Sequence, residues 1–262
     1  MWLDRVWREW REARVLRRRA IPEQLWRLTL ARYPFLQLRD PTDQAQLRRL
    51  STLFLAEKEF HGIDGFEVSD EVAVAVAAQA CLLVLHLGLE RYRGVKGIVM
   101  HADQVLARRE VMDEDGLVHE FDEVLSGEAM EGGPLMLSWA DVQEAGNDAG
   151  AAYNVVMHEF AHVLDMQDGQ ANGVPPQASS AQRAVWVETM EAEYEVFCSL
   201  LEQEHETAID AYGEEGPEEF FAVAVEAFFV TPQALRSDHA RLYALLSDYF
   251  GQDPAPLTAR SS

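Results

Sequence analysis

The sequence predicts an α+β protein that is predominantly helical and contains a small sheet. Apolar residues recur at helical spacing over long segments, and helices are predicted over 181–204, 217–230 and 232–248. Three shorter segments, 97–101, 116–121 and 134–139, have strand composition and are bounded by glycine or proline. The chain has 262 residues, of which 48% are apolar, so it is long enough for a sizeable core and too apolar for general disorder.

The first half of the chain is expected to be mainly helical, with breaks at proline and glycine. Helices are predicted over 23–33, over about 42–60 and over 72–89. The segment 72–89 is the most apolar, but Gln79 and His86 interrupt it and it is short for a transmembrane helix. We therefore expect a buried core helix there and no transmembrane segment in the chain.

Charge and cysteine content restrict the partners and the compartment. The net charge of −23 argues against direct binding of nucleic acid, since phosphate contacts need clustered cations. The two cysteines, Cys81 and Cys198, lie in apolar, helix-like segments and are predicted to be free thiols of a reducing compartment. With no cleavable signal and no long apolar span, the expected location is cytoplasmic.

Residues 1–20 depart from the acidic composition of the rest of the chain. They contain seven arginines and three acids, and Trp2, Val6, Trp10 and Ala13 recur at helical spacing. The pattern predicts a basic amphipathic helix. Such a helix contacts a membrane surface or an acidic partner, or it docks on the acidic body of its own chain. The last interpretation is the favoured one.

The most informative motif is His158-Glu159-Phe160-Ala161-His162. Residues four apart lie on one face of a helix, so both imidazoles can reach one metal ion. Glu159 follows the first histidine and is placed to act as general base toward a water on the metal. Apolar residues surround the motif and predict a buried helix. A core helix with two hydrogen-bonded histidines is the less favoured alternative.

A catalytic zinc ion needs three protein ligands and an open position, and the sequence offers three candidates for the third ligand. Asp168 stands six residues past His162, as in metzincin-type sites, but the glycine of their intervening turn is missing. His205 is the second candidate, although its acidic neighbours predict an exposed helix end. Glu219 is favoured, because it lies among apolar residues of a predicted helix, where an acid is costly unless paired or metal-bound.

Two further acids are candidates for orienting the ligands. Asp165 lies three residues past His162 and seven past His158, where it can accept the second ring N–H of a histidine ligand. Glu226 lies seven residues past Glu219 and therefore on the same face of its helix. We expect both carboxylates to act behind the ligands and not as ligands themselves.

The motifs on both sides of this site resemble those of a known family, the Mlc titration factor A metallopeptidases. The matching segments are Ile63-Asp64-Gly65-Phe66, 77–83, Leu137-Ser138-Trp139, 154–165, Asp168-Gly169, Ala171-Asn172-Gly173, Pro175-Pro176, 219–223 and 226–229. The resemblance runs from about residue 20 to about residue 250, and its motifs are long and specific.

The resemblance implies a zincin-like metallopeptidase core of the gluzincin type, with a small sheet and an active-site helix, related to the catalytic core of anthrax lethal factor. It implies one zinc ion per chain, bound by His158, His162 and Glu219, with Glu159 as general base. A tyrosine seven residues before the glutamate ligand assists catalysis in such sites, and Tyr212 stands at that spacing. The implied activity is aminopeptidase-like hydrolysis of a peptide or protein substrate.

A second hypothesis, from a different class, also follows from the resemblance. Enterobacterial members of the family bind and sequester a transcriptional repressor, Mlc. The alternative function is therefore a binding protein for a repressor of this type, with a zinc site that is weakly active or regulatory.

Together these patterns predict four parts of the chain. They are a basic amphipathic segment (1–20), a mainly helical part packed on the core (21–130), a zincin-like catalytic part (131–250) and a flexible tail (251–262).

The strand at 134–139 precedes the motif helix, and we expect it to bind an extended peptide by edge pairing.

Overall fold

The computed structural model describes residues 2–37, 40–103, 105–112, 118–125, 127–129, 133–145 and 152–255. Up to residue 92 the chain is mainly helical. The helices of this part are α1 (Trp2–Arg18), α2 (Glu23–Arg32), α3 (Pro41–Glu57) and α4 (Asp70–Leu83), with 3-10 turns η1 (Pro34–Gln37) and η2 (Leu89–Tyr92). Asp40 caps α3 and Ser69 caps α4, because each side chain accepts backbone N–H groups of the first turn.

Helix α4 is shorter than the predicted segment 72–89. It ends at Leu83 because the chain turns at 84–87 and then reaches Gly88, whose φ of 89° does not continue a helix. Every residue from Val74 to Leu83 is buried, which explains why the sequence there is apolar except for Gln79. None of the described helices combines the length and the apolarity that crossing a bilayer requires.

The second half carries the remaining helices. They are α5 (Trp139–Glu144), α6 (Val155–Asp165), η3 (Met166–Asp168), α7 (Ser180–Glu202), η4 (Ala211–Glu215), α8 (Pro217–Val230), α9 (Pro232–Asp238) and α10 (Ala240–Phe250). Asn154 caps α6 and Ser179 caps α7, while Pro217 occupies the first turn of α8, where its missing N–H is not needed. The predicted helix over 232–248 is divided in two at His239.

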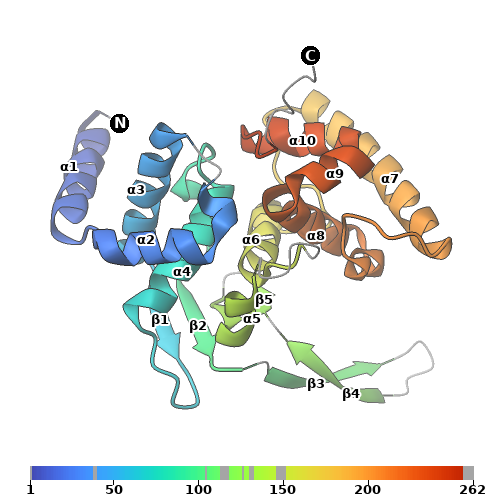
Figure 1. Cartoon of the computed structure of the whole chain (residues 1–262), viewed down its shortest axis with the longest axis horizontal. Coiled ribbons are helices and arrows are strands. Elements are labelled where there is room, and N and C mark those ends of the chain that lie inside the picture. The colour runs from blue at the N-terminus through green and yellow to red at the C-terminus, as the bar shows by residue number, and fades with distance from the viewer. Residues whose placement is uncertain are drawn as a thin grey trace.

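Four of the described strands form one sheet in the order β1-β2-β6-β5. They are β1 (Glu59–Gly62), β2 (Gly97–His101), β6 (Leu135–Ser138) and β5 (Gly127–Ala129). The first three are parallel, and β5 runs antiparallel to β6. The strands β3 (Val105–Met112) and β4 (Val118–Leu125) pair only with each other in an antiparallel ladder. Figure 1 shows the strands along one side of the helices.

The expectation that strand 134–139 binds a peptide at its edge is wrong. Strand β6 has β2 on one side and β5 on the other, so neighbouring strands already occupy both of its hydrogen-bonding edges. The edge of the described sheet next to β6 is β5. This short antiparallel strand also lies against α6.

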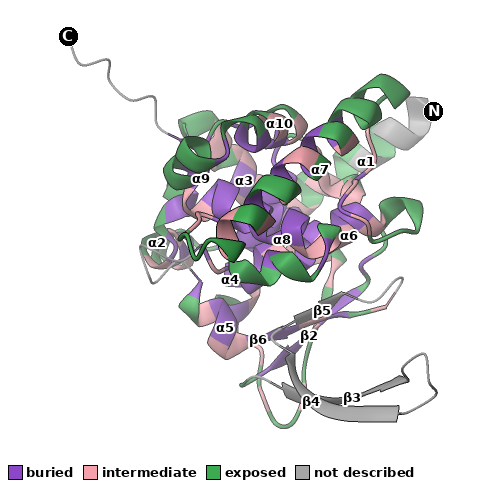
Figure 2. Ribbon diagram, turned by 90° about the vertical axis from the view of Figure 1, so that its right-hand side faces the viewer, coloured by how far each residue is buried: buried purple, intermediate pink, exposed green. Residues whose placement is uncertain are grey.

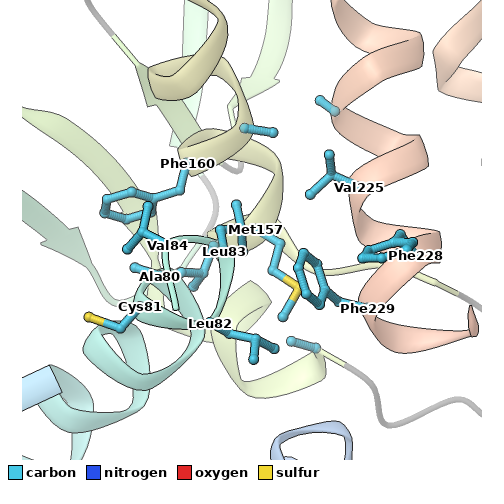
Figure 3. Close-up of a cluster of buried hydrophobic side chains, with 14 of the residues drawn as sticks. Ala80, Cys81, Leu82, Leu83, Val84, Met157, Phe160, Val225, Phe228 and Phe229 are labelled. Carbon is cyan, nitrogen blue, oxygen red and sulfur yellow. The ribbon is translucent and has the colours of Figure 1, made fainter. Parts of the chain in front are cut away.

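A single apolar core joins the two halves of the chain. Figure 3 shows its centre, where Met157 of α6 lies between the side chains of α4 and those of Val225, Phe228 and Phe229 of α8, while Phe160 of α6 lies on the side of Val84. Figure 2 shows that the buried faces of the helices meet around α6 and α8. Because both helices are anchored in this core, the polar side chains they direct out of it are held in fixed positions.

The predicted parts of the chain are closely connected in space. Strands β1 and β2 come from before residue 130, yet they share a sheet with β6 from after it. The expected flexible tail does not begin at residue 251, because Gln252 and Ala255 are buried. The amide of Gln252 donates to the Leu82 carbonyl, and the Ala255 N–H donates to the Tyr243 hydroxyl. Residues 256–262 lie outside the described residues.

The N-terminal helix was expected to dock on the acidic body of its own chain, and it does pack on its own chain, although the ion pair described there does not join one of its arginines to an acid. Helix α1 packs against α3, and the ion pair between them joins Glu12 of α1 to Arg49 of α3. This ion pair joins an acid of α1 to an arginine of α3, and not an arginine of α1 to an acid of the rest of the chain. The arginines from Arg14 to Arg19 remain exposed.

Candidate metal centre

Helix α6 positions both histidines of the motif. The Asn154 side chain accepts the Met157 N–H at 3.0 Å and so fixes the first turn. Phe160 and Leu164 anchor one side of the helix in the core, while His158 and His162 are half-buried on another side. Their Nε2 atoms lie 3.2 Å apart, as the i,i+4 spacing predicts. The two imidazoles therefore converge on one point.

Helix α8 brings Glu219 to the same point. Its Oε2 atom lies 3.1 Å from Nε2 of His158 and 3.4 Å from Nε2 of His162. Proline at the start of α8 and the burial of Phe220 to Phe229 fix this helix against α6. Among the described residues, these three side chains are the group placed to hold a metal ion.

The three atoms fit a tetrahedral metal ion. Zinc bonds of about 2.0–2.1 Å in tetrahedral geometry place two ligand atoms about 3.3–3.4 Å apart, close to the separations found here. Oε2 of Glu219 is buried and makes no hydrogen bond within the described part of the chain, although two imidazole nitrogens lie next to it. Two imidazole nitrogens and one carboxylate oxygen gathered at one place are a donor set suited to a cation.

The other two candidates for the third ligand lie elsewhere. Asp168 is exposed in η3, where its carboxylate accepts the Gln170 N–H at 3.3 Å. His205 is exposed beyond the end of α7. Neither belongs to the group that surrounds the two imidazoles.

Glu226 lies about two turns further along α8 than Glu219, on the other side of the His158 ring. It is buried, and its Oε1 atom lies 2.8 Å from Nδ1 of His158. Its Oε2 atom accepts the backbone N–H of Asn154, and the Asn154 amide donates to Gln79 of α4 at 2.8 Å. One buried polar chain thus joins α4, the start of α6, and α8 to the imidazole.

Sequence reasoning missed the contributions of Asn154 and Gln79 to this series of buried hydrogen bonds. Two signals were present in the sequence. An asparagine directly before an apolar helical run is a strong N-cap signal, and a lone glutamine in the most apolar segment needs a buried hydrogen-bond partner. Neither signal names the partner, because Asn154 and Gln79 are 75 residues apart.

Glu159 is only 5% exposed, although it follows the half-buried His158 directly on α6. Burial raises the pKa of its carboxyl to about 7, against the opposing effect of the two histidines. A carboxylate whose pKa lies near neutrality can both accept and return a proton near pH 7. A pKa in this range is the one that a general acid–base group needs.

The imidazole and carboxylate charges of the group depend on one another. Burial lowers the pKa of His158, but the carboxylates of Glu219 and Glu226 outweigh it and raise that pKa to about 10. Burial raises the pKa of Glu219, but His158 and His162 outweigh it and lower that pKa to about 2. Without a metal ion, a proton on His158 therefore balances part of the negative charge.

Tyr212 lies in η4, next to the candidate metal ligands and partly exposed to solvent. Its ring centroid lies 6.0 Å from that of His158, and 49% of its surface is exposed. The Asp210 carboxylate accepts the Tyr212 N–H at 2.9 Å and caps this turn. The sequence spacing therefore places the tyrosine beside the candidate ligands, on the solvent side.

Asp165 has a different set of partners from the one expected. Its Oδ2 atom accepts the N–H groups of Asn172 and Gly173 at 2.8 and 2.7 Å, and no histidine hydrogen-bonds to it in the described part of the chain. The reason is its position at the last residue of α6, where the following loop folds back. Gly173 has a φ of 72°, and a Cβ there would lie 2.4 Å from the Pro217 carbonyl oxygen, so the loop fits only glycine.

Comparison with known proteins identifies the family. The sequence profile of the glucose-regulated metallo-peptidase M90 family matches residues 7–251. This chain belongs to that family. The predicted resemblance is confirmed, and the M90 match covers the elements from α1 to α10.

Several curated relatives align over nearly the whole M90 region. An uncharacterised protein of Synechocystis is 36% identical over 95% of this chain and 90% of its own length. Mlc titration factor A of Cronobacter sakazakii is 34% identical over 87% of this chain and 86% of its own length. Mlc titration factor A of Klebsiella pneumoniae is 32% identical over 88% of this chain and 87% of its own length. The M90 family is one of metallopeptidases, and its metal requirement agrees with the donor set on α6 and α8.

Proposed function

We propose that this chain is a zinc-dependent peptidase of the gluzincin type, in which His158, His162 and Glu219 are the metal ligands. The observation that carries the proposal is the convergence of two imidazole nitrogens and one carboxylate oxygen. The buried Glu159 directly follows the first of these histidines. Two nitrogens and one oxygen from HExxH and a later glutamate match the ligands of catalytic zinc sites. Such sites keep one position open for water or substrate.

The residues of the chain supply the other parts of the reaction. A zinc ion held by His158, His162 and Glu219 would supply Lewis acidity, which lowers the pKa of water and polarises a carbonyl group. Glu159 accepts the proton of the attacking water and later delivers it to the leaving amine. Tyr212 donates a hydrogen bond to the oxyanion that develops on the carbonyl oxygen. Glu226 holds the His158 ring in the tautomer and orientation that leave Nε2 available.

The substrate is proposed to be an extended peptide. Strand β5 is the edge of the described sheet beside α6, so its free backbone groups are available to pair with a peptide strand. The aminopeptidase-like preference rests on the family resemblance. A cytoplasmic location is part of the same proposal and agrees with the free thiols of Cys81 and Cys198.

The test is cleavage of a peptide library by the purified protein and by the Glu159→Gln variant. Gln keeps the size of the side chain but does not accept a proton, so turnover should fall about 10²–10⁴-fold while zinc stays bound. Glu218→Gln is the matched control, since Glu218 lies half-buried beside Glu219 on α8 and is not a candidate for any step. Equal cleavage by wild type and Glu159→Gln would remove the general base from the proposal.

A second candidate function is binding of a transcriptional repressor of the Mlc type, with a metal site that is weakly active or regulatory. The names of the relatives from Cronobacter and Klebsiella favour it. A repressor of the Mlc type, passed over the immobilised chain, tests this candidate. If Glu159→Gln keeps repressor binding while cleavage is lost, binding is separate from the peptidase activity.

A further inference from the structure

About a third of the cations of this chain lie in its first 20 residues, most of them in α1. Residues 1–20 carry seven of the 22 lysines and arginines, although the whole chain has a net charge of −23. From Trp186 to Glu226, over α7, η4 and most of α8, the sequence has thirteen acids and no lysine or arginine. Figure 1 places α1 at the opposite end of the molecule from α7. The chain is therefore electrically polar, and α1 is its positive end.

Helix α1 has one side turned to the protein and one turned to solvent. Glu12, Val15 and Leu16 are partly covered, and Glu12 pairs with Arg49 of α3. These positions follow the i, i+3, i+4 pattern of one helix face. The other side of α1 carries residues that the packing on α3 leaves uncovered.

The uncovered side consists of two zones, which we call the outer face of α1. Its apolar zone is formed by Val6, Trp7 and Trp10, which are 40%, 64% and 50% exposed. Its basic zone lies one to two turns further along and is formed by Arg14, Arg17 and Arg18. The Arg14 guanidinium lies over the Trp10 ring, 5.5 Å from its centroid, and so connects the two zones.

We propose that the outer face of α1 docks the protein on the surface of an anionic lipid bilayer. Tryptophan rings are amphipathic and favour the boundary between headgroups and acyl chains, where an in-plane helix buries its apolar side. The arginines beside them bind the acidic headgroups. Both zones are needed, because a single short apolar zone or a few charges alone gives only marginal binding.

A lipid surface fits this face better than an acidic protein does. The face is the convex side of a single helix with exposed indole rings, which a flat, deformable headgroup layer covers without a matching groove. The acid-rich segment 186–226 also favours one orientation, since an anionic membrane repels it while it attracts the arginines of α1. The peptidase would then work beside a membrane without a transmembrane helix. The docking does not depend on the metal centre.

Sedimentation with vesicles tests the proposal. The full-length protein is mixed with vesicles of phosphatidylcholine alone, or with about one third phosphatidylglycerol, and the bound fraction is measured. Binding to the anionic vesicles only, weakened by salt, is the expected result. The exposed indoles should also shift their fluorescence to shorter wavelength when anionic vesicles are added, as they leave water.

Two pairs of variants identify the face. Trp7→Ala with Trp10→Ala should reduce the partition coefficient at least about tenfold, whereas Leu28→Ala with Val185→Ala, also exposed apolar residues, should not. Arg14→Gln with Arg17→Gln should reduce it about fivefold per arginine. Arg27→Gln with Arg183→Gln, which removes two exposed arginines elsewhere, is the control.

Other outcomes overturn the proposal. Absence of binding to anionic vesicles at low salt does so, and so does equal binding by the tryptophan variant and its control. Binding to polyglutamate without binding to vesicles assigns the face to an acidic protein partner. A dimer that becomes a monomer in the tryptophan variant, without vesicle binding, assigns it to a second copy of the chain.

Discussion

Glu226 and His158 are 68 residues apart in the sequence, and Oε1 of the glutamate lies 2.8 Å from Nδ1 of the imidazole. The same ring faces Glu219 with its other nitrogen, Nε2, at 3.1 Å. Helix α8 therefore contacts both nitrogens of one histidine, with one glutamate in the donor set and one behind it. This arrangement explains why two acids seven residues apart stand in an otherwise apolar helix.

The first prediction concerns the glutamate behind the ring. Glu226→Gln should lower zinc affinity about 10–100-fold, because the amide no longer stabilises the ring N–H with a full negative charge. Zinc affinity is measured by competition with a chromophoric chelator. Glu218→Gln on the same helix should bind zinc like the wild type. An unchanged affinity in Glu226→Gln would show that the contact with His158 does not support the metal.

The second prediction concerns Tyr212. Tyr212→Phe should keep zinc and lose about 10–10³-fold in kcat, because one hydrogen-bond donor to the developing oxyanion is removed. Half of the side chain is exposed, so the substitution should leave the stability of the fold nearly unchanged. Steady-state cleavage of one peptide by both proteins separates kcat from KM. Equal kcat values would exclude the tyrosine from the reaction.

The third prediction separates Asp165 from the metal. Asp165→Asn should lower the free energy of unfolding by about 1–3 kcal/mol, because a buried acceptor of two loop N–H groups is weakened. Zinc content should stay the same, since Asp165 does not hydrogen-bond a histidine. Urea unfolding with metal present measures the first effect, with the exposed Asp168→Asn as control. Loss of zinc without loss of stability would restore the role expected from the sequence.

The fourth prediction concerns pH. Without metal, the raised pKa of His158, about 10, means that the ring carries a proton at pH 7, which zinc must displace. Apparent zinc affinity should therefore rise with pH, by about tenfold per unit for one displaced proton, between pH 6 and 9. Calorimetry in buffers of different ionisation enthalpy counts the protons released. A zinc affinity that is flat over this range would contradict a protonated His158.

The sign of the accompanying stability effect follows from the same pKa values. In the metal-free protein, the raised pKa of His158 contributes stability that is fully present below about pH 6.5 and is lost as pH rises through about 10. The lowered pKa of Glu219 contributes stability that is lost as pH falls through about 2.

Much of this architecture is local and was predictable from the sequence. The two histidines of α6 meet because they are four residues apart, and the helix is recognisable from its apolar surroundings. Glu219 and Glu226 are recognisable as acids that an apolar helix tolerates only with partners. The predominantly helical fold class and the family were predictable for the same reason, because both depend on local patterns and motifs, and both are confirmed.

The parts that were not predicted depend on contacts between distant segments. The place of β6 inside the sheet is set by its pairing with β5 and β2, and no local pattern of strand 134–139 distinguishes an inner strand from an edge. Asp165 was assigned to a histidine from helical spacing alone. The helix ends there, so the loop that follows supplies closer donors than the ring does.

The central claim is that the metal is held by α6 and α8 together, and zinc content after dialysis tests it most directly. Wild type should retain about one zinc ion per chain, and Glu219→Ala should lose most of it, as should His162→Ala. Asp168→Ala should retain nearly all of its zinc, because Asp168 is exposed and outside the donor group. If Asp168→Ala loses its zinc while Glu219→Ala keeps it, the third ligand comes from the loop after α6, and the assignment to α8 is wrong.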